Sequence, residues 1–226
     1  DTIRFHVRTV APIHIGCDEV YEPTTFIVDE QKGVLKSFDP LAFVRALSPA
    51  DKKKFSDICA KGTIESLLEI YRFMRGKNFR GRAVSLCPGF MAHYQDTMKL
   101  PAADRRKIQQ ELNNFAIART AFNPNTGLPY IPGSSIKGAL RTAWLNKMQR
   151  EKKIRKDDRR KGKELEKELL DGGDFSSDPL RMLKVSDFMP VGKVKTRIVY
   201  AVNEKKKLSE FGAKGQCQIL EVIEPG

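Results

Sequence analysis

The chain has 226 residues, of which 41 are Lys or Arg and 28 are Asp or Glu, so its formal net charge is +13 at pH 7. Hydrophobic residues make up 40% of it, which is enough for a packed core and excludes wholesale disorder. No apolar stretch approaches the roughly 18 consecutive residues that a membrane-spanning helix needs, so we expect a soluble protein. The excess of positive charge favours an anionic partner.

The four cysteines, at positions 17, 59, 87 and 217, form no Cys-x-x-Cys pair and have no histidine at zinc-finger spacing. We therefore expect free thiols in a reducing compartment rather than disulfides or a metal site, and nothing in the sequence calls for a cofactor. The first residues show no basic region followed by an apolar run, so no secretory signal is expected and the predicted location is the cytoplasm.

The first elements in chain order are predicted to be strands. Alternating apolar and polar residues predict a strand over residues 2–10. Two further strands, over 24–29 and 34–38, flank a turn that contains Gly33 and predict a hairpin.

Helical spacing follows the hairpin. One helix is predicted from Pro40, and Ser48 marks its end and the start of a second. Residues 63–74 carry the clearest apolar stripe of a helix, with Gly76 as its cap, and a further helix is predicted over 103–115.

Residues 131–143 read Ile-Pro-Gly-Ser-Ser-Ile-Lys-Gly-Ala-Leu-Arg-Thr-Ala. We predict a loop at Gly133 and Ser134, followed by a helix whose N-cap is Ser134 or Ser135. The unpaired N–H groups and partial positive charge of such a helix start attract phosphate, and Lys137 and Arg141, one turn apart, add charge on the same face. A well-capped helix after a tight turn, without a ligand, is the alternative interpretation.

The spacing from Gly133 to Gly138 also matches the glycines of a nucleotide-hydrolysing P-loop. Ala139 and Leu140 stand where that motif requires Lys and Ser or Thr, so nucleotide hydrolysis is excluded. The anion predicted for this segment is the phosphate of a polymer.

The same block resembles the glycine-rich loop and first helix of the RAMP superfamily of CRISPR-associated proteins. Within that superfamily, the chain looks most like the subunit-five family of the type III-A (Csm) effector complexes. The other segments that carry the resemblance are 9–16 with 21–23, 38–40, 180–187, which is similar to the strand after the first helix, and 220–226, which is similar to a later core strand.

The resemblance implies an α+β fold with a ferredoxin-like (RRM-like) core and large helical insertions. It places core strands and a helix at about 1–20, 122–150 and 180–226, a helical insertion at about 40–118 and a basic insertion at about 150–178. Superfamily members usually continue into a second ferredoxin-like half, for which this sequence offers no segment.

The resemblance also implies a function: a non-catalytic subunit that binds CRISPR RNA near its 3′ end, caps the backbone filament of an antiviral complex and takes part in crRNA maturation. The implied partners are CRISPR RNA, the repeating backbone subunit, the small helical subunit and target RNA, with no membrane.

Positive charge is concentrated between Lys147 and Lys163, where ten Lys or Arg face three Asp or Glu. Such a run is ordinarily a solvated helix or a mobile insertion. It can also track phosphates, and we predict that Lys147 and Arg150, nearest the folded core, contact RNA first.

Near the N-terminus, His14 and Gly16 follow the first predicted strand, where His14 can contact RNA phosphate or a base. Tyr21, Phe122 and Tyr130 lie in predicted loops, where stacking on a base would contribute about 1–3 kcal/mol each. Asp18 and Glu19 are interpreted as solvated loop acids rather than as a metal or acid–base pair.

No catalytic residue or metal ligand is predicted. The alternatives are a metal-independent endoribonuclease that uses His14 on CRISPR repeat RNA, a backbone-type subunit of a type III complex, and a structural protein whose basic helix docks on an acidic partner. The predicted RNA-binding residues are His14, Gly16, Tyr21, Gly133, Ser134, Ser135, Lys137, Gly138, Arg141, Lys147 and Arg150.

Overall fold

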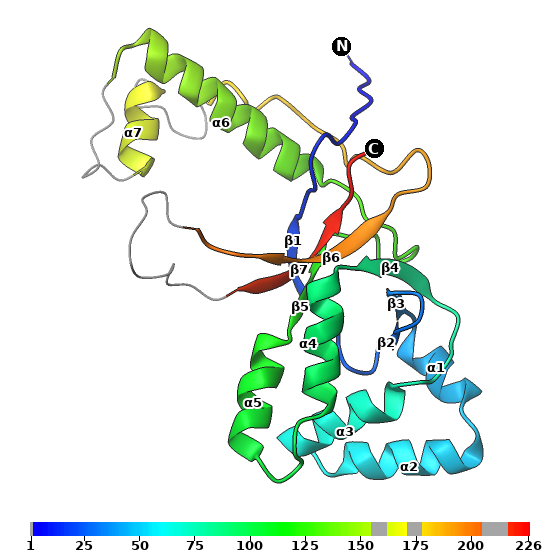
Figure 1. The fold of residues 1–226 in the computed structure, drawn as a ribbon. Coiled ribbons are helices and arrows are strands. Elements are labelled where there is room, and N and C mark those ends of the chain that lie inside the picture. Colours follow the sequence, from blue (N-terminus) through cyan, green and yellow to red (C-terminus); the bar gives the residue numbers. More distant parts are fainter. Residues whose placement is uncertain (1, 155–161, 171–177, 205–216) are drawn as a thin grey trace. The chain divides into compact units, whose positions relative to one another are not determined.

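The computed structural model describes residues 2–154, 162–170, 178–204 and 217–226. The chain forms two compact units, one from residues 1–129 and 192–226 and the other from residues 130–191. Figure 1 shows a mixed α+β first unit and a second unit made of helices and extended chain. The segments predicted to form the discontinuous core, at about 1–20, 122–150 and 180–226, include residues of both units.

The first unit contains a seven-stranded sheet in the order β1-β5-β7-β6-β4-β3-β2. Its strands are β1 (Gly16–Val20), β2 (Phe26–Asp29), β3 (Val34–Ser37), β4 (Arg82–Leu86), β5 (Ile117–Thr120), β6 (Thr196–Ala201) and β7 (Gln218–Ile223). β5 is parallel to β7 and β4 is parallel to β6, whereas the other neighbouring strands are antiparallel. The sheet thus joins strands from both ends of the sequence.

Between β3 and β5, the sequence of the first unit forms five helices. They are α1 (Pro40–Ala46), α2 (Pro49–Ala60), α3 (Ile64–Met74), α4 (Pro88–Met98) and α5 (Arg105–Asn114). The second unit contributes α6 (Gly133–Glu151) and α7 (Gly162–Leu169). No helix in the described part of the chain is long and apolar enough to cross a membrane.

Local sequence signals account for the confirmed elements. The predicted hairpin is β2 and β3, and Gly33 in its turn has a φ of 63°, which glycine adopts without steric cost. Ser48 caps α2, and Thr63 caps α3 in a reciprocal pair of hydrogen bonds with Ser66. Gly76, at a φ of 76°, follows the end of α3 as predicted.

The main core lies between the sheet and helices α3, α4 and α5 (Figure 1). Leu68 and Tyr71 of α3 pack there, whereas Ile70 and Phe73 of the same helix pack into a second cluster with α1 and α2. The apolar residues of α3 thus pack on two sides, and they include the stripe from which the helix was predicted. Full burial of such a side chain stabilises the fold by about 1.5–3 kcal/mol.

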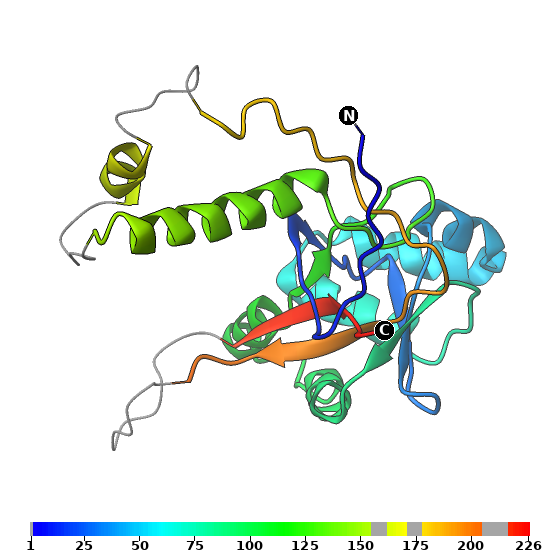
Figure 2. The ribbon, with the colours of Figure 1, turned by 90° about the horizontal axis from the view of Figure 1, so that it is seen from above.

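The strand predicted over residues 2–10 is wrong. The described part of this segment has no strand, and its apolar side chains are exposed, Ile3 by 73% and Phe5 by 66%. Backbone pairing begins only at Thr9, whose carbonyl accepts from Gly226 N, and at Ile13, which bridges Ile223. Figure 2 shows the two ends of the chain side by side there. An alternating pattern makes a strand only where a neighbouring strand is present.

Two other assignments differ from the sequence prediction. Residues 180–187, which resemble a family strand, form a turn and an extended segment, and only Phe188 makes a bridge, to Ile131. Strands β1, β4, β5 and β6 and helices α4 and α7 had no predicted counterpart. Pro88 at the first position of α4 is a helix-start signal that the sequence did contain.

Candidate nucleic-acid interface

The predicted glycine-serine loop of the second unit is helical. Helix α6 begins at Gly133, with Pro132 rather than a serine at its N-cap. The N–H of Gly133 donates to Asp187 Oδ1 at 2.8 Å, and the N–H groups of Ser135 and Ile136 donate to the carbonyl of Pro132. A carboxylate of the chain itself therefore already occupies much of the anion-binding capacity of this helix start.

Gly133 serves close packing within the chain. A Cβ at this position would lie 2.1 Å from the carbonyl oxygen of Val185 and 2.7 Å from its carbonyl carbon. The glycine thus lets two backbone segments touch, whereas the sequence interpretation assigned it to a ligand. A Cβ at Gly138 would meet nothing within 4 Å, so that surface of α6 is open.

Arg141 also has partners within the second unit. Its Nε and Nη2 donate to Glu166 Oε1 at 2.9 and 2.5 Å, and its Nη1 donates to Asp178 Oδ2. The hydrogen bonds to Glu166, more than those to Asp178, raise the pKa of Arg141 above its usual value. The side chain joins α6 to α7 and to the segment at 178, so a phosphate would compete with two carboxylates for it.

The other predicted residues of α6 remain accessible. Ser134, Ser135 and Gly138 are exposed, and Lys137 is half-buried. Lys147 is exposed, and its pair with Glu151 is loose, at 3.7 Å.

Arg150 lines an open hollow of ≈ 500 Å³ at the C-terminal end of α6. The other lining residues are Asn146, Gln149, Lys153 and Ile154, so two cations border a largely polar surface. The basic run continues through residues 155–161, which lie outside the described residues.

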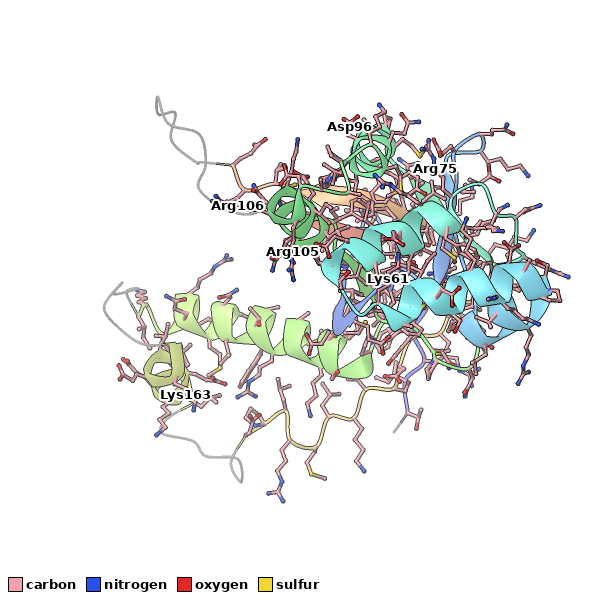
Figure 3. All side chains as sticks on the ribbon, turned by 90° about the horizontal axis from the view of Figure 1, so that it is seen from below. Lys61, Arg75, Asp96, Arg105, Arg106 and Lys163 are labelled. Atoms are coloured by element: carbon pink, nitrogen blue, oxygen red, sulfur yellow. The ribbon has the colours of Figure 1, made fainter. Side chains whose placement is uncertain are left out.

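A second concentration of charge escaped the sequence interpretation. Residues 40–116 carry 14 Lys or Arg against 7 Asp or Glu, a net charge equal to the +7 of residues 147–163. In Figure 3, Lys61 just after α2 and Arg105 and Arg106 on α5 mark this helical layer. Several of its cations are paired, Lys61 with Glu69 and Arg105 with Glu65, so net charge overstates what is free.

In the first unit, His14 is oriented by the backbone. Its Nδ1 lies 2.8 Å from the carbonyl oxygen of Glu221, which can only accept, so Nδ1 carries the hydrogen. The side of the ring with Nε2 faces Gly16, whose Cβ, if present, would lie 3.9 Å away. His14 is half-buried and Gly16 is exposed, so both predicted contacts remain accessible.

Tyr21 is not a stacking platform. It is 3% exposed, its hydroxyl donates to Glu221 Oε2 at 2.9 Å and accepts from Arg82 Nη2 at 2.5 Å. Burial, and then the charge of Glu221, raise the pKa of Tyr21 above its usual value. The prediction of an exposed loop ring is wrong because Tyr21 belongs to a buried polar network.

That network also contains Glu221, Arg82 and Thr196, which the sequence interpretation did not assign to a site. Glu221 on β7 is fully buried and accepts from Arg82 Nη2 at 2.6 Å, and Arg82 Nη1 donates to Thr196 Oγ1 at 2.9 Å. The charges are paired and hydrogen-bonded, which is the condition for burying them. Only the tertiary structure brings together residues that lie about 140 positions apart.

Arg119 on β5 is a further residue that the sequence interpretation missed. Its guanidinium carbon lies 3.4 Å from the centre of the Phe122 ring and 4.9 Å from that of Tyr21. A face of Phe122, predicted to stack on a base, is thus covered by a cation.

The eleven predicted RNA-binding residues are divided between the units. His14, Gly16 and Tyr21 belong to the first unit, and the other eight belong to α6 in the second. In the part of the chain that the structure describes, no three His, Cys, Asp or Glu side chains gather in a way that could hold a metal ion.

Comparison with known proteins assigns the family. The model of the RAMP superfamily matches residues 6–226. Three curated relatives are each named CRISPR system Cms protein Csm5. The relative from Methanocaldococcus jannaschii is 30% identical over 199 residues, which are 82% of this chain and 42% of the relative. The relative from Enterococcus italicus is 21% identical over 93% of this chain and 54% of its own length. The relative from Streptococcus thermophilus is 26% identical over 64% of this chain and 38% of its own length.

Among solved structures, a chain from the cryo-EM structure of a Csm–crRNA–target RNA ternary complex of a type III-A CRISPR–Cas system matches with a TM-score of 0.50 and 18% identity. The match covers 97% of this chain and 60% of that chain, so it supports the fold. This chain spans about half the length of the curated relatives that it matches. With a superfamily match over nearly its full length and relatives that all carry the Csm5 name, the chain belongs to the RAMP superfamily.

Proposed function

We propose that this chain is a non-catalytic, CRISPR RNA-binding subunit of a type III-A complex, which caps the filament near the 3′ end of the crRNA and takes part in its maturation. The names of the relatives and the crRNA-containing neighbour support this proposal. The repeating backbone subunit, the small helical subunit and target RNA are its proposed partners. The four free cysteines fit the cytoplasm as its location.

The sheet supports a ferredoxin-like core as part of the proposal. In the run β1-β5-β7-β6, the parallel pair β5 and β7 is central, and β1 and β6 flank it antiparallel. A ferredoxin-like sheet has the same sequence of pairing senses, with two parallel central strands between antiparallel neighbours.

The observation that carries RNA binding is the accessible face of α6. Gly133 and Arg141 have structural roles, but Ser134, Gly138, Lys147 and Arg150 are exposed. An open glycine permits close approach of a backbone, and exposed cations supply phosphate contacts without reading bases. We therefore assign phosphate binding to Lys147 and Arg150 before Arg141.

The double variant Lys147→Glu with Arg150→Glu tests this assignment in the full chain. It should weaken binding to all single-stranded RNA sequences alike and reduce the salt slope by about 1.4, from about 0.7 for each lost phosphate contact. The matched control is Lys32→Glu with Arg45→Glu, which makes the same charge change at exposed positions of the first unit. Equal affinities of the two double variants for CRISPR RNA would sink the assignment.

An endoribonuclease remains the competing hypothesis for the first unit. Under this hypothesis His14 takes part in catalysis, but its Nδ1 is held by a backbone carbonyl rather than by an acid, so no relay activates it. We expect no cleavage of repeat RNA by the purified chain in EDTA. Cleavage that is lost in His14→Ala would replace the non-catalytic proposal.

A further inference from the structure

Arg119 is a largely buried cation whose ion pair with Glu19, at 3.9 Å, is too long for a hydrogen bond. It lies on β5, its guanidinium packs against the rings of Tyr21 and Phe122, and its side chain is only 16% exposed. We call these three residues the Arg119 clamp. Contact with two rings limits the orientations of the guanidinium, so less conformational entropy is lost when a ligand binds.

The guanidinium has hydrogen-bonding capacity to spare. Removing water from a cation is costly unless an acidic group compensates, as Glu221 does for Arg82 at 2.6 Å. The carboxylate that faces Arg119 is Glu19, whose Oε2 is 3.9 Å from Nη1, beyond hydrogen-bonding distance. Nε of Arg119 is buried and has no hydrogen-bond partner among the described residues.

The surroundings indicate where a ligand would approach. Glu19 belongs to the edge strand β1 and its side chain is 59% exposed, so the Nη1 end of the guanidinium faces the surface. His14 is held close by: Ile15 N donates to Thr120 Oγ1, and Ala121 N donates to the carbonyl of Ile15. These hydrogen bonds tie the segment that carries His14, just before β1, to the residues that follow Arg119 at the end of β5.

We propose that the Arg119 clamp binds one phosphate of the RNA backbone, an inference that rests on the proposed RNA-binding function and adds a residue to it. A phosphodiester supplies two acceptor oxygens that match the fork of a guanidinium, which the loose ion pair with Glu19 does not. Asp18 and Glu19 on β1 carry negative charge that opposes a second phosphate. The clamp is thus a single-phosphate site rather than a track for many.

The test replaces Arg119 by Met in the full chain, with Arg45→Met on the exposed surface of α1 as the matched loss of charge. Arg119→Met should reduce the affinity for CRISPR RNA by about ten- to a hundredfold and lower the salt slope by about 0.7, whereas Arg45→Met should change neither. The melting temperature of Arg119→Met should stay the same or rise, because a buried donor without a partner is removed.

Arg119→Lys separates geometry from charge. It keeps the cation but loses the planar fork, so the salt slope should persist while the affinity falls severalfold. If Arg119→Met lowers the melting temperature and binds RNA as tightly as Arg45→Met does, Arg119 is a packing residue and the inference is overturned. If Arg119→Met does not fold, wild-type RNA affinity in Arg119→Lys overturns it.

The two proposals fail in different ways. If the wild-type chain binds RNA and Lys147→Glu with Arg150→Glu weakens that binding while Arg119→Met does not, only the Arg119 clamp is refuted. If the wild-type chain binds no RNA, the proposed function fails and the clamp fails with it.

Discussion

Two glycines of α6 differ in their surroundings: Gly133 packs against the backbone of Val185, whereas Gly138 faces open space. In Gly133→Ala, the new Cβ would fall 2.1 Å from the carbonyl oxygen of Val185, inside any permitted contact. The obstacle is backbone rather than a flexible side-chain end, so the segment around Val185 must move. That movement also strains the hydrogen bond from Gly133 N–H to Asp187, 2.8 Å long.

The magnitude follows from three terms. Overpacking costs about 1–3 kcal/mol, and loss of a hydrogen bond to a charged group costs about 1.5–3 kcal/mol. Replacing glycine in a helix returns about 1 kcal/mol, so Gly133→Ala should destabilise the second unit by roughly 2–5 kcal/mol. Gly138→Ala is the matched control on the same helix, and since its Cβ meets nothing within 4 Å, it should stabilise α6 by up to about 1 kcal/mol.

Hydrogen exchange of the α6 amides measures this effect in the second unit separately from the first. A difference of about 3 kcal/mol between the variants corresponds to roughly a hundredfold difference in protection, since each 1.4 kcal/mol is a factor of ten. Equal protection of α6 in the two alanine variants would refute the packing role of Gly133. It would return that glycine to the phosphate-binding role that the sequence suggested.

Two further predictions concern buried polar groups of the first unit. Glu221→Gln should lower the free energy of unfolding, measured in urea, by about 3 kcal/mol, because it leaves the buried Arg82 without its carboxylate. The double variant Arg82→Met with Glu221→Met should recover most of that loss. A double variant as unstable as Glu221→Gln would contradict this account. Burial raises the pKa of Tyr94 from 10.0 to about 12, so the folded state keeps this proton at a pH where the unfolded chain loses it. The contribution of this proton to the free energy of unfolding is complete below pH 10 and is lost as the pH rises towards 12. The stability of Tyr94→Phe should therefore fall less between pH 10 and pH 12 than that of the wild type. Parallel profiles of stability against pH would refute the raised pKa of Tyr94.

Sequence patterns predicted helices α1, α2, α3 and α5, although not α4, because the signals of those helices are local. Ser48 and Thr63 are helix caps whose side-chain bonds reach only three residues along the chain, and the stripe on α3 repeats at the period of a single helix. The turn at Gly33 needs only a permitted backbone angle. Such features do not depend on which distant segments pack beside them.

The strands were less predictable because each needs a partner. Residues 2–8 alternate as a strand would, yet no described segment pairs with them, whereas β6 pairs along its whole length with β7 and was not predicted. Sheet pairing is decided by neighbours that are distant in sequence.

The predicted site shows the same division. The sequence alone identified α6 as a basic helix behind a glycine-serine block and marked His14 and Gly16 at the start of the chain. The tertiary structure decided which of those groups are free: Asp187 takes the N–H of Gly133, two carboxylates take Arg141, and Tyr21 is buried. It also brought forward Arg119, because its burial, and the lack of a hydrogen-bond partner for its Nε among the described residues, are properties of packed surroundings rather than of a residue type.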